Sequence, residues 1–516
     1  MHHVPSVELR STPRLHISQP RRRGFLYSHT ADRLLSASLQ SSLERFAKPW
    51  YAARRLRIFR DETDLSATRR KAGAHILFSA VPILRGVVST TTSPNPQHVS
   101  VDGAGESTVT RIQSIDIFRG ITLAVMIFVN DLDGTKGLPW WTFHAKASWD
   151  VMTYVDMVFP VFLFLVGMSL PIAVKARLRK NPSRWALWTH VFMRSAALVI
   201  LGLILANGGS ADPRHMIIAP QLWVFIGVLG ASLFLSVYPG KGDSPWWHKA
   251  LRTLGAIMVI AMYSLFRRTG HDGQIHWIDG SYPEILGLIG YAYFAVCLLY
   301  IPFRRWLIAP FLWLIALVTF NAVTTVPFIA MVAPHSAAAA YWLRFRFGLR
   351  GYQWPWGNGS SASLIMAGIV TTVIFLEAKR FRTFRQKLLP AMAFALSALA
   401  AGYLLKPLGI SKIRATPTWC LYTIAFAVAA FTLLYWVCDI KKKTGWAFAF
   451  RPAGSNTLTT YLLPDYWDII LSLLGITFLG EHFGYGWHGV AKSLVFTCLM
   501  LAIAALLTRM KIRLAL

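Results

Sequence analysis

The chain is poor in charge, and the charge it has is mostly of one sign. Only 15% of its 516 residues are charged, and 23 acidic residues stand against 53 basic ones. An ordinary soluble protein carries ~25% charged residues, whereas this chain is 54% apolar with a mean hydropathy of +0.45. A single soluble domain is therefore excluded, because too little polar surface is available to cover the apolar side chains. Disorder of the whole chain is excluded for the same reason.

Cysteine pairs and nucleotide-binding motifs are also missing. The four cysteines (Cys297, Cys420, Cys438 and Cys498) form no C-x-x-C pair and lie in or beside apolar runs. We therefore expect core-filling thiols, with no disulfide framework and no metal site. The sequence contains no Walker loop, dinucleotide fingerprint or G-x-S-x-G elbow, so these nucleotide-binding and hydrolase classes are not indicated.

Long apolar stretches are abundant instead. Twelve of them are long enough to cross ~30 Å of hydrocarbon as helices. They lie near 116–132, 152–174, 188–207, 217–238, 252–267, 283–302, 306–328, 361–377, 388–405, 416–438, 455–478 and 490–508. The sequence thus predicts an all-α polytopic integral membrane protein of eleven or twelve transmembrane helices over residues 111–516. Residues 1–110, rich in Arg and Ser, are expected to form a basic, disordered extension without a nucleic-acid partner.

The basic residues indicate an orientation. Lys and Arg concentrate in the connections after the second, fourth, sixth, eighth and tenth stretches and in the C-terminal tail. Because short cytoplasmic loops carry an excess of Lys and Arg, these connections are expected to face the cytoplasm. Both termini would then be cytoplasmic, and the loop 133–151 would face the opposite side.

The first predicted helix carries ionisable residues. Each costs roughly 2.5–3.5 kcal/mol inside a membrane, so we expect each to have a structural or functional role. Asp116 and Arg119 lie three residues apart, on one helix face. They could pair with each other at the interface, or they could orient a phosphorylated cofactor arriving from the cytoplasm. Asn130, Asp131 and Asp133 end the same helix, where a polar C-terminal cap is the simplest interpretation.

A histidine and a buried carboxylate follow. His144 lies in the outer loop among Trp140, Trp141 and Trp149, and Asp156 begins the next stretch, four residues before Pro160. The tryptophans could form an interfacial belt. The spacing of twelve positions from His144 to Asp156 allows the loop and the helix to fold back into a His–carboxylate pair. Such a pair fixes the imidazole tautomer and raises its basicity, as a general base requires.

Two adjoining segments resemble a known family. They read RIQSIDIFRGITLAVMIFVND and HAKASWDVMTYVDMVFPVFLFLVGMSLP, and their most specific features are S-x-D-x-F-R-G, F-V-N and D-x-V-F-P-x-F-L-F-x-V-G. They are similar to the heparan-α-glucosaminide N-acetyltransferase family and its bacterial relatives. Weaker matches are GNGSSASLIMAGIV at 357–370, SKIRATPTW at 411–419 and PAGSNTLTTY at 452–461.

The resemblance implies transfer of an acetyl group from cytoplasmic acetyl-CoA to the amine of a terminal glucosamine across the membrane. The functional Asn then corresponds to Asn130. The functional His corresponds to His144, the only histidine of its loop, although KASW places Lys146 where the family has its histidine. A homodimer is also implied, and the likeness to the bacterial relatives implies a bacterial inner membrane.

The same resemblance suggests roles for other residues and leaves several alternatives open. Asp156 would orient His144, while Asp116 and Arg119 would face the cofactor. Asn456 would have a conformational or cofactor-facing role, with a simple helix N-cap as the alternative. His144 could act as a general base or as a transient acyl carrier, and a hydroxyl could replace the amine as acceptor. A transporter, or a non-catalytic membrane protein of the same fold, is the competing class.

Overall fold

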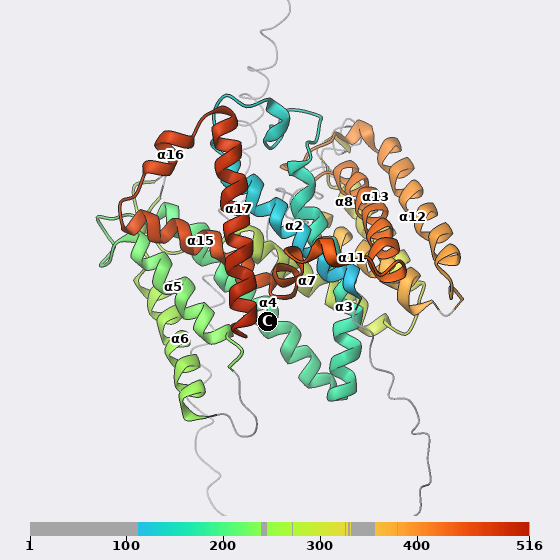
Figure 1. Ribbon diagram of the computed structural model, residues 1–516, viewed down its shortest axis with the longest axis horizontal. Helices are drawn as coiled ribbons and strands as arrows, with labels where there is room; N and C mark the ends of the chain where they lie inside the picture. Colours follow the sequence, from blue (N-terminus) through green and yellow to red (C-terminus); the bar gives the residue numbers. More distant parts are fainter. Residues whose placement is uncertain are drawn as a thin grey trace, which may run out of the picture. The chain divides into compact units, whose positions relative to one another are not determined.

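The described part of the chain is almost entirely helical (Figure 1). The computed structural model describes residues 112–238, 245–270, 272–325, 327–328, 331, 357–378 and 380–514. Its α-helices are α2 (Gln113–Leu132), α3 (Val155–Lys180), α4 (Arg184–Asn207), α5 (Pro220–Leu235), α6 (Trp246–Leu265), α7 (Glu284–Phe303), α8 (Ala309–Val323), α11 (Ser360–Thr372), α12 (Phe384–Leu404), α13 (Pro417–Leu434), α14 (Phe450–Ser455), α15 (Thr457–Leu473), α16 (Phe478–Phe483) and α17 (Gly486–Arg509). In the described ranges the only strands are β1 (Arg268–Thr269) and β2 (Ile275–His276), which pair antiparallel.

The predicted fold class is confirmed. Each of the twelve apolar stretches contains one of these helices, and π-helical turns at Val373–Glu377 and Tyr435–Ile440 extend α11 and α13. Among the described residues, seven helices are long and apolar enough to cross a membrane: α3, α4 with its 3₁₀ extension, α7, α11 and α13 with their π turns, α12 and α17. The predicted extension 1–110 lies outside the described residues.

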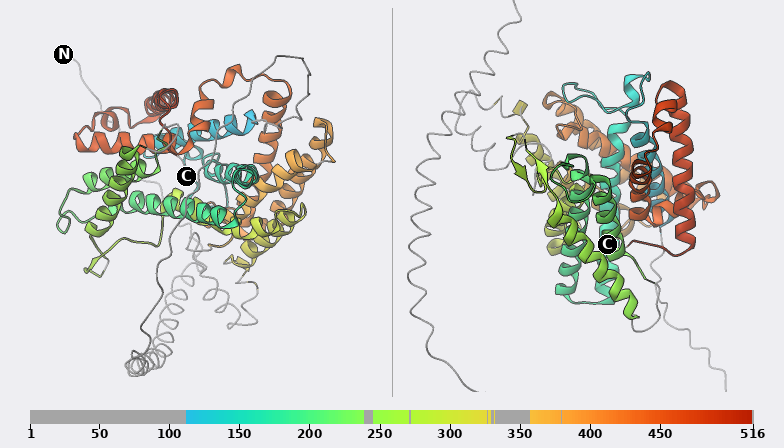
Figure 2. Two further views of the ribbon diagram at one scale, coloured as in Figure 1. Left: turned by 90° about the horizontal axis from the view of Figure 1, so that it is seen from below. Right: turned by 90° about the vertical axis from the view of Figure 1, so that its left-hand side faces the viewer.

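The helix on the eleventh stretch takes an unexpected direction. α15 has 17 residues, and it runs across α17 rather than alongside it (Figures 1 and 2). The prediction of core-filling thiols is confirmed at three of the four cysteines. Cys297, Cys420 and Cys438 are buried as expected, whereas Cys498 is exposed.

The antiparallel pair of α2 and α3 positions the candidate site. The first amides of α2 lack helical partners, and the Asp439 carboxylate after α13 accepts from the N–H groups of Gln113 and Ser114, both at 3.0 Å. In α3, Pro160 has no N–H to offer the carbonyl of Asp156 one turn earlier. The Trp419 indole of α13 donates to that carbonyl at 3.0 Å. α13 therefore stabilises the helix turn that carries Asp156.

Glycines bring α3 and α11 into backbone contact. A Cβ atom at Gly167 would lie 1.8 Å from the Ile365 carbonyl oxygen, and one at Gly368 would lie 2.0 Å from that of Phe164. The hydroxyl of Thr372 then reaches the Met168 carbonyl at 2.8 Å. Close packing of small residues is how membrane helices associate without a hydrophobic driving force between them. The scaffold under the site therefore depends on these two glycines.

Replacing Gly368 by Ala should destabilise the protein, because the added methyl group must push two packed helices apart. Overpacking of this kind costs about 1–3 kcal/mol, which we expect to lower the midpoint of thermal unfolding in detergent by several degrees. The matched control is Gly445→Ala, since a Cβ atom there meets nothing within 4 Å. Equal unfolding midpoints for the two variants would contradict the tight α3–α11 contact.

Candidate functional site

His144 and Asp156 meet as the sequence predicts. His144 lies in the loop between α2 and α3, and its Nδ1 atom is 2.7 Å from Asp156 Oδ1. The imidazole is 39% exposed, whereas the carboxylate is only 1% exposed. Thr153 donates its N–H and its hydroxyl to Asp156 Oδ2 at 3.0 and 3.2 Å, and the N–H of Ala145 adds a third bond at 3.2 Å. The first turn of α3 and the loop are thus tied together through one carboxylate.

This geometry determines which ring nitrogen can react. An ionised carboxylate only accepts hydrogen bonds, so Asp156 holds the proton on Nδ1 of His144. The Nε2 atom then carries the lone pair, which is the arrangement that a general base or a nucleophilic imidazole needs. Lys146 is placed differently, with its Nζ atom 5.4 Å from the ring centroid of Trp149 on the exposed side of the loop. The His–Asp pair therefore singles out His144 over Lys146.

Asn130 and His144 share a small cavity. It has a volume of about 110 Å³ and is lined by Val129, Asn130, Asp133, Thr142, Phe143, His144 and Val155. The other polar residues at the end of α2 cap and anchor the helix. The N–H of Asp133 binds the carbonyls of Val129 and Asn130, and Asp131 forms an ion pair with Lys492 of α17 at 3.2 Å. Asp133 thus occupies the predicted C-cap position through its backbone, whereas the Asp131 side chain binds another helix.

A lysine that the sequence analysis did not single out completes the cluster. Lys412, in the connection between α12 and α13, places Nζ 3.1 Å from His144 Nε2 and 3.3 Å from Nδ1. Desolvation lowers the pKa of Lys412 to about 8, although the negative charges of Asp156 and Asp133 act in the opposite direction. The only indication in the sequence was the weak family match of SKIRATPTW, which contains this residue.

Two buried amides hold the connection that carries Lys412. The side chains of Asn321 and Asn358 both donate to the Ala415 carbonyl, at 3.0 and 2.9 Å. Arg414 pairs with Asp150 in the loop of His144, and the hydrogen bond from Arg414 lowers the pKa of that carboxyl. The weakly matching segments at 357–370 and 411–419 therefore converge on His144.

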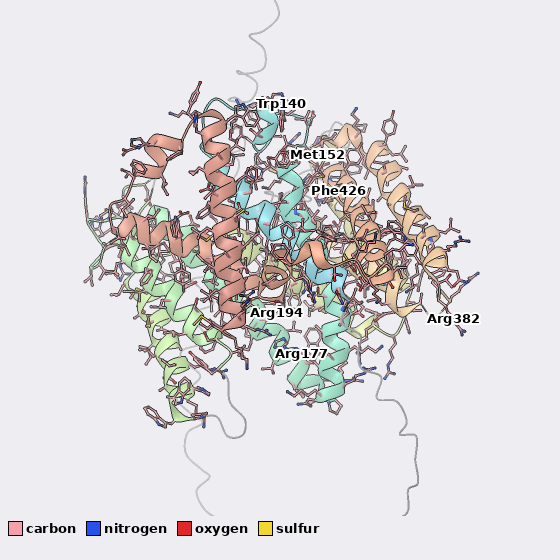
Figure 3. All side chains as sticks on the ribbon, viewed as in Figure 1. Trp140, Met152, Arg177, Arg194, Arg382 and Phe426 are labelled. Carbon is pink, nitrogen blue, oxygen red and sulfur yellow. The ribbon has the colours of Figure 1, made fainter. Side chains whose placement is uncertain are left out.

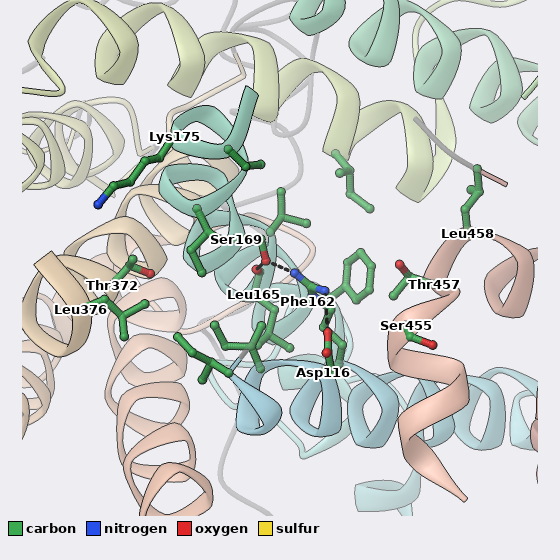
Figure 4. A pocket seen from close by; sticks show the side chains of 18 of the residues that line it. Asp116, Phe162, Leu165, Ser169, Lys175, Thr372, Leu376, Ser455, Thr457 and Leu458 are labelled. Atoms are coloured by element: carbon green, nitrogen blue, oxygen red, sulfur yellow. Dashed lines mark hydrogen bonds and ion pairs between the residues drawn. The ribbon is translucent and has the colours of Figure 1, made fainter. Parts of the chain in front are cut away.

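A much larger cavity, of about 870 Å³, opens near the other ends of α2 and α3 (Figure 4). Asp116, Arg119 and Ser169 lie on its wall. Asp116 and Arg119 form an ion pair at 3.3 Å, and Arg119 also donates to the Ser169 hydroxyl. Both interpretations of this pair thus agree with the geometry: the two residues bind each other, and they face a cavity large enough for a cofactor.

The large cavity is basic. Its lining contains five basic and three acidic side chains: Arg119, Lys175, Arg179, Arg194 and Lys442, with Asp116, Glu377 and Asp439. The labelled arginines Arg177, Arg194 and Arg382 lie toward the lower part of the view in Figure 3, whereas Trp140 in the loop of His144 lies at the top. The small cavity and the basic cavity therefore occupy opposite ends of the α2–α3 pair.

Asn456 is not part of this wall, although its neighbours Ser455 and Thr457 are. Its side chain is buried and donates to the Ile512 carbonyl at 2.9 Å, and its Oδ1 atom accepts from the Thr459 hydroxyl at 2.6 Å. It occupies the N-cap position of α15, but its side chain caps no backbone amide. These contacts favour a role in positioning α15 against the end of α17, and contact with a cofactor stays a prediction.

An apolar cluster separates the two cavities. Leu123, Met126 and Val129 of α2 pack there against Val155 and Val158 of α3. Val129 and Val155 also line the small cavity. On the other side, Phe162 and Tyr461 pack against the cluster and line the large cavity. The apolar cluster therefore lies between the linings of the two cavities along this seam.

Comparison with known proteins agrees with the motifs. Residues 111–229 match the family model described as the catalytic region of heparan-α-glucosaminide N-acetyltransferase. The resemblance to this family is confirmed. Among curated proteins, the human enzyme of that name is 37% identical over 97 residues, and the mouse enzyme is 34% identical over 101 residues. These alignments cover 19% and 20% of this chain, but only 14% and 15% of the relatives' own lengths. The matched region contains α2, α3 and the loop of His144.

Proposed function

We propose that this protein is an integral-membrane acyltransferase that moves an acetyl group from cytoplasmic acetyl-CoA to the amine of a glucosamine-type sugar or glycan on the far side. The observation that carries the proposal is the pairing of two sites on one helix pair. A His–Asp dyad with Asn130 lies at one end, and a basic cavity of about 870 Å³ lies at the other. The match of residues 111–229 to the acetyltransferase family supports the same activity.

The basic cavity suits the phosphate-bearing head of CoA. Lys175, Arg179 and Lys442 on its lining would neutralise the phosphates, and Arg119, held between Asp116 and Ser169, would present a fixed guanidinium. The polybasic connection that follows α3 lies at this end, so the positive-inside rule places the cavity on the cytoplasmic side. With the same orientation, both termini are cytoplasmic.

The pantetheine arm would run along the seam between α2 and α3. Its thioester must pass the apolar layer of Leu123, Met126, Val129, Val155 and Val158 to reach His144. These side chains have flexible or small groups and form no hydrogen bonds that would have to break. The layer thus separates the two aqueous sides until the cofactor arm displaces it.

At the thioester, three residues act together. His144 Nε2 takes the proton of the attacking amine, or carries the acetyl group for a moment. The amide of Asn130, on the wall of the small cavity, donates to the thioester oxygen as negative charge develops there. Asp156 keeps the imidazole in the reactive tautomer. A burst of CoA release in the absence of acceptor would favour the acetyl-histidine course over direct transfer.

Radiolabelled transfer tests the proposal directly. The purified protein in detergent is given acetyl-labelled acetyl-CoA with glucosamine, amino-sugar oligosaccharides or their hydroxyl analogues. We expect labelled N-acetyl product and stabilisation of the protein by CoA in thermal unfolding. O-acetylated product would retain the chemistry with a different acceptor. The absence of both CoA binding and transfer with every acceptor would instead favour a transporter of the same fold.

Removing basic residues from the cavity wall should weaken CoA binding. We expect Lys175→Gln together with Arg179→Gln to raise the Kd for CoA about tenfold or more, because each lost charge–phosphate contact contributes about 1 kcal/mol. The control is Lys180→Gln with Arg184→Gln, two neighbouring basic residues outside the cavity lining. Calorimetric titration measures both, and equal losses of affinity would argue against CoA in this cavity.

A further inference from the structure

We propose that Lys412 is a further catalytic residue: its ammonium group protonates the sulfur of CoA as the acetyl group departs. The inference rests on the proposed acetyl transfer and assigns the one step that the His144–Asp156 dyad leaves open. The geometry points to it because Lys412 is the cation in contact with the reacting imidazole, with Nζ 3.1 Å from Nε2.

The position of Nζ is informative. Its distances to the two ring nitrogens of His144 are nearly equal, at 3.1 and 3.3 Å. An atom on the lone-pair axis of Nε2 would be far closer to Nε2 than to Nδ1, so Nζ lies beside the ring and leaves that axis open. The acceptor amine can therefore approach Nε2 while Lys412 faces the other partner of the reaction, the thioester.

The site is built to hold this lysine. Asn321 and Asn358 fix the backbone of its connection at Ala415, and the N–H of Ser411 donates to the Thr416 hydroxyl at 3.0 Å. Arg414 next to it pairs with Asp150 of the His144 loop. Side chains held by such supporting bonds keep the precise spacing that proton transfer needs. A lysine with no role beyond exposure to solvent would not require two buried amides to fix the backbone of its connection.

The chemistry balances without any further reagent. The amine nitrogen attacks the acetyl carbon, the C–N bond forms, and the proton of the nitrogen passes to His144 Nε2. The C–S bond breaks and its electron pair goes to sulfur, which takes a proton from Lys412 Nζ. The imidazolium then releases its proton to water and the neutral lysine takes one up from water, because Nζ does not lie on the N–H axis of Nε2. The net result is an amide and the CoA thiol, with both residues restored.

The desolvated surroundings suit this role. They lower the pKa of Lys412 to about 8, against 10.5 for an ordinary lysine. A catalytic acid works best when its pKa lies near the operating pH, because a large fraction is then protonated and the proton is still released readily. Transfer should accordingly decline as the pH rises through about 8 and the ammonium form is lost.

Single-turnover transfer rates test the assignment, using the full chain in detergent with Lys412→Ala, Lys412→Arg and the control Lys406→Ala from the same connection. We expect the transfer rate of Lys412→Ala to be about 10²-fold lower than that of the unmodified protein. The decline of rate near pH 8 should be absent from this variant. Lys412→Arg should remain impaired, since a guanidinium keeps the charge but does not release its proton. Lys406→Ala should match the unmodified protein.

A second donor separates proton donation from a structural role. An acetyl thioester of an electron-poor aromatic thiol leaves without protonation, so Lys412→Ala should transfer from it at nearly the unmodified rate. Equal losses with both donors, full activity of Lys412→Arg, or an unimpaired Lys412→Ala would each overturn the role of Lys412. An inactive unmodified protein would instead refute the proposed function, which keeps the two failures apart.

Discussion

Replacement of His144 by Ala should abolish acetyl transfer and leave CoA binding intact. The bond from Nδ1 to Asp156 leaves the lone pair on Nε2, and Lys412, the other ionisable group in contact with the ring, is not held by a carboxylate in the same way. We expect a loss of about 10³-fold or more in kcat. The CoA cavity lies at the other end of the helix pair, so the Kd for CoA should remain within twofold.

The chain supplies a matched control for this variant. His215 is paired with Asp212 at 3.0 Å and is 41% exposed, much like His144 with its own aspartate. His215→Ala should retain full transfer activity, because that pair is not on the lining of either cavity. Normal activity of His144→Ala in the same single-turnover assay would refute the assignment of the reacting imidazole.

Asp156→Asn should cost nearly as much activity, for a different reason. An amide in this place can turn its NH₂ group toward His144, which moves the imidazole proton to Nε2 and removes the free lone pair. The corresponding change in a Ser-His-Asp triad lowers kcat about 10⁴-fold, and we expect a loss of about 10³–10⁴-fold here. The amide oxygen can keep the place of Oδ2 and its bonds from Thr153 and Ala145, so the substitution acts mainly on the imidazole.

Two measurements identify the cause of the activity loss expected for Asp156→Asn. Proton NMR of the labelled imidazole should show a change of tautomer in Asp156→Asn, and the Kd for CoA should stay unchanged. The control is Asp212→Asn, which removes the same type of carboxylate from the other His–Asp pair. If Asp156→Asn transferred acetyl groups at the unmodified rate, Asp156 would have only a structural part in the loop.

Much of this architecture could be predicted because it depends on local properties. Apolar runs of the right length become helices wherever water is absent, since only a helix satisfies every backbone group within one segment. The contact between His144 and Asp156 could also be predicted from the sequence, because the two residues are only twelve positions apart and the loop has few ways to close on its own helix. The C-cap position of Asp133 likewise follows from its place at the end of α2.

The remainder depends on contacts between segments far apart in the chain. Lys412 meets a histidine 268 residues away, and nothing in the local pattern of SKIRATPTW reveals that meeting. Asn456 was expected to cap a helix, to face a cofactor or to act in a conformational role, and only packing reveals that its side chain binds the Ile512 carbonyl after α17. Whether a polar side chain in a membrane protein lines a cavity or binds another helix is decided by packing, which spacing along one helix does not encode.

The direction of α15 illustrates the same limit. Its apolar content predicts a helix correctly, but its course across α17 is set by neighbours such as Asn456 and Thr508, which meet at 3.4 Å. The tight contact of Gly167 with Ile365 is another case. A glycine in a membrane helix indicates that some backbone approaches closely, but it does not name the partner helix.

Transfer across a sealed membrane tests the central claim most directly. The protein is reconstituted in sealed vesicles, with labelled acetyl-CoA on one side and glucosamine linked to an impermeant polymer on the other or on the same side. The two cavities at opposite ends of α2 and α3 predict labelled polymer only when donor and acceptor are on opposite sides. Equal labelling with both on one side of intact vesicles would contradict an acetyl group carried through the protein.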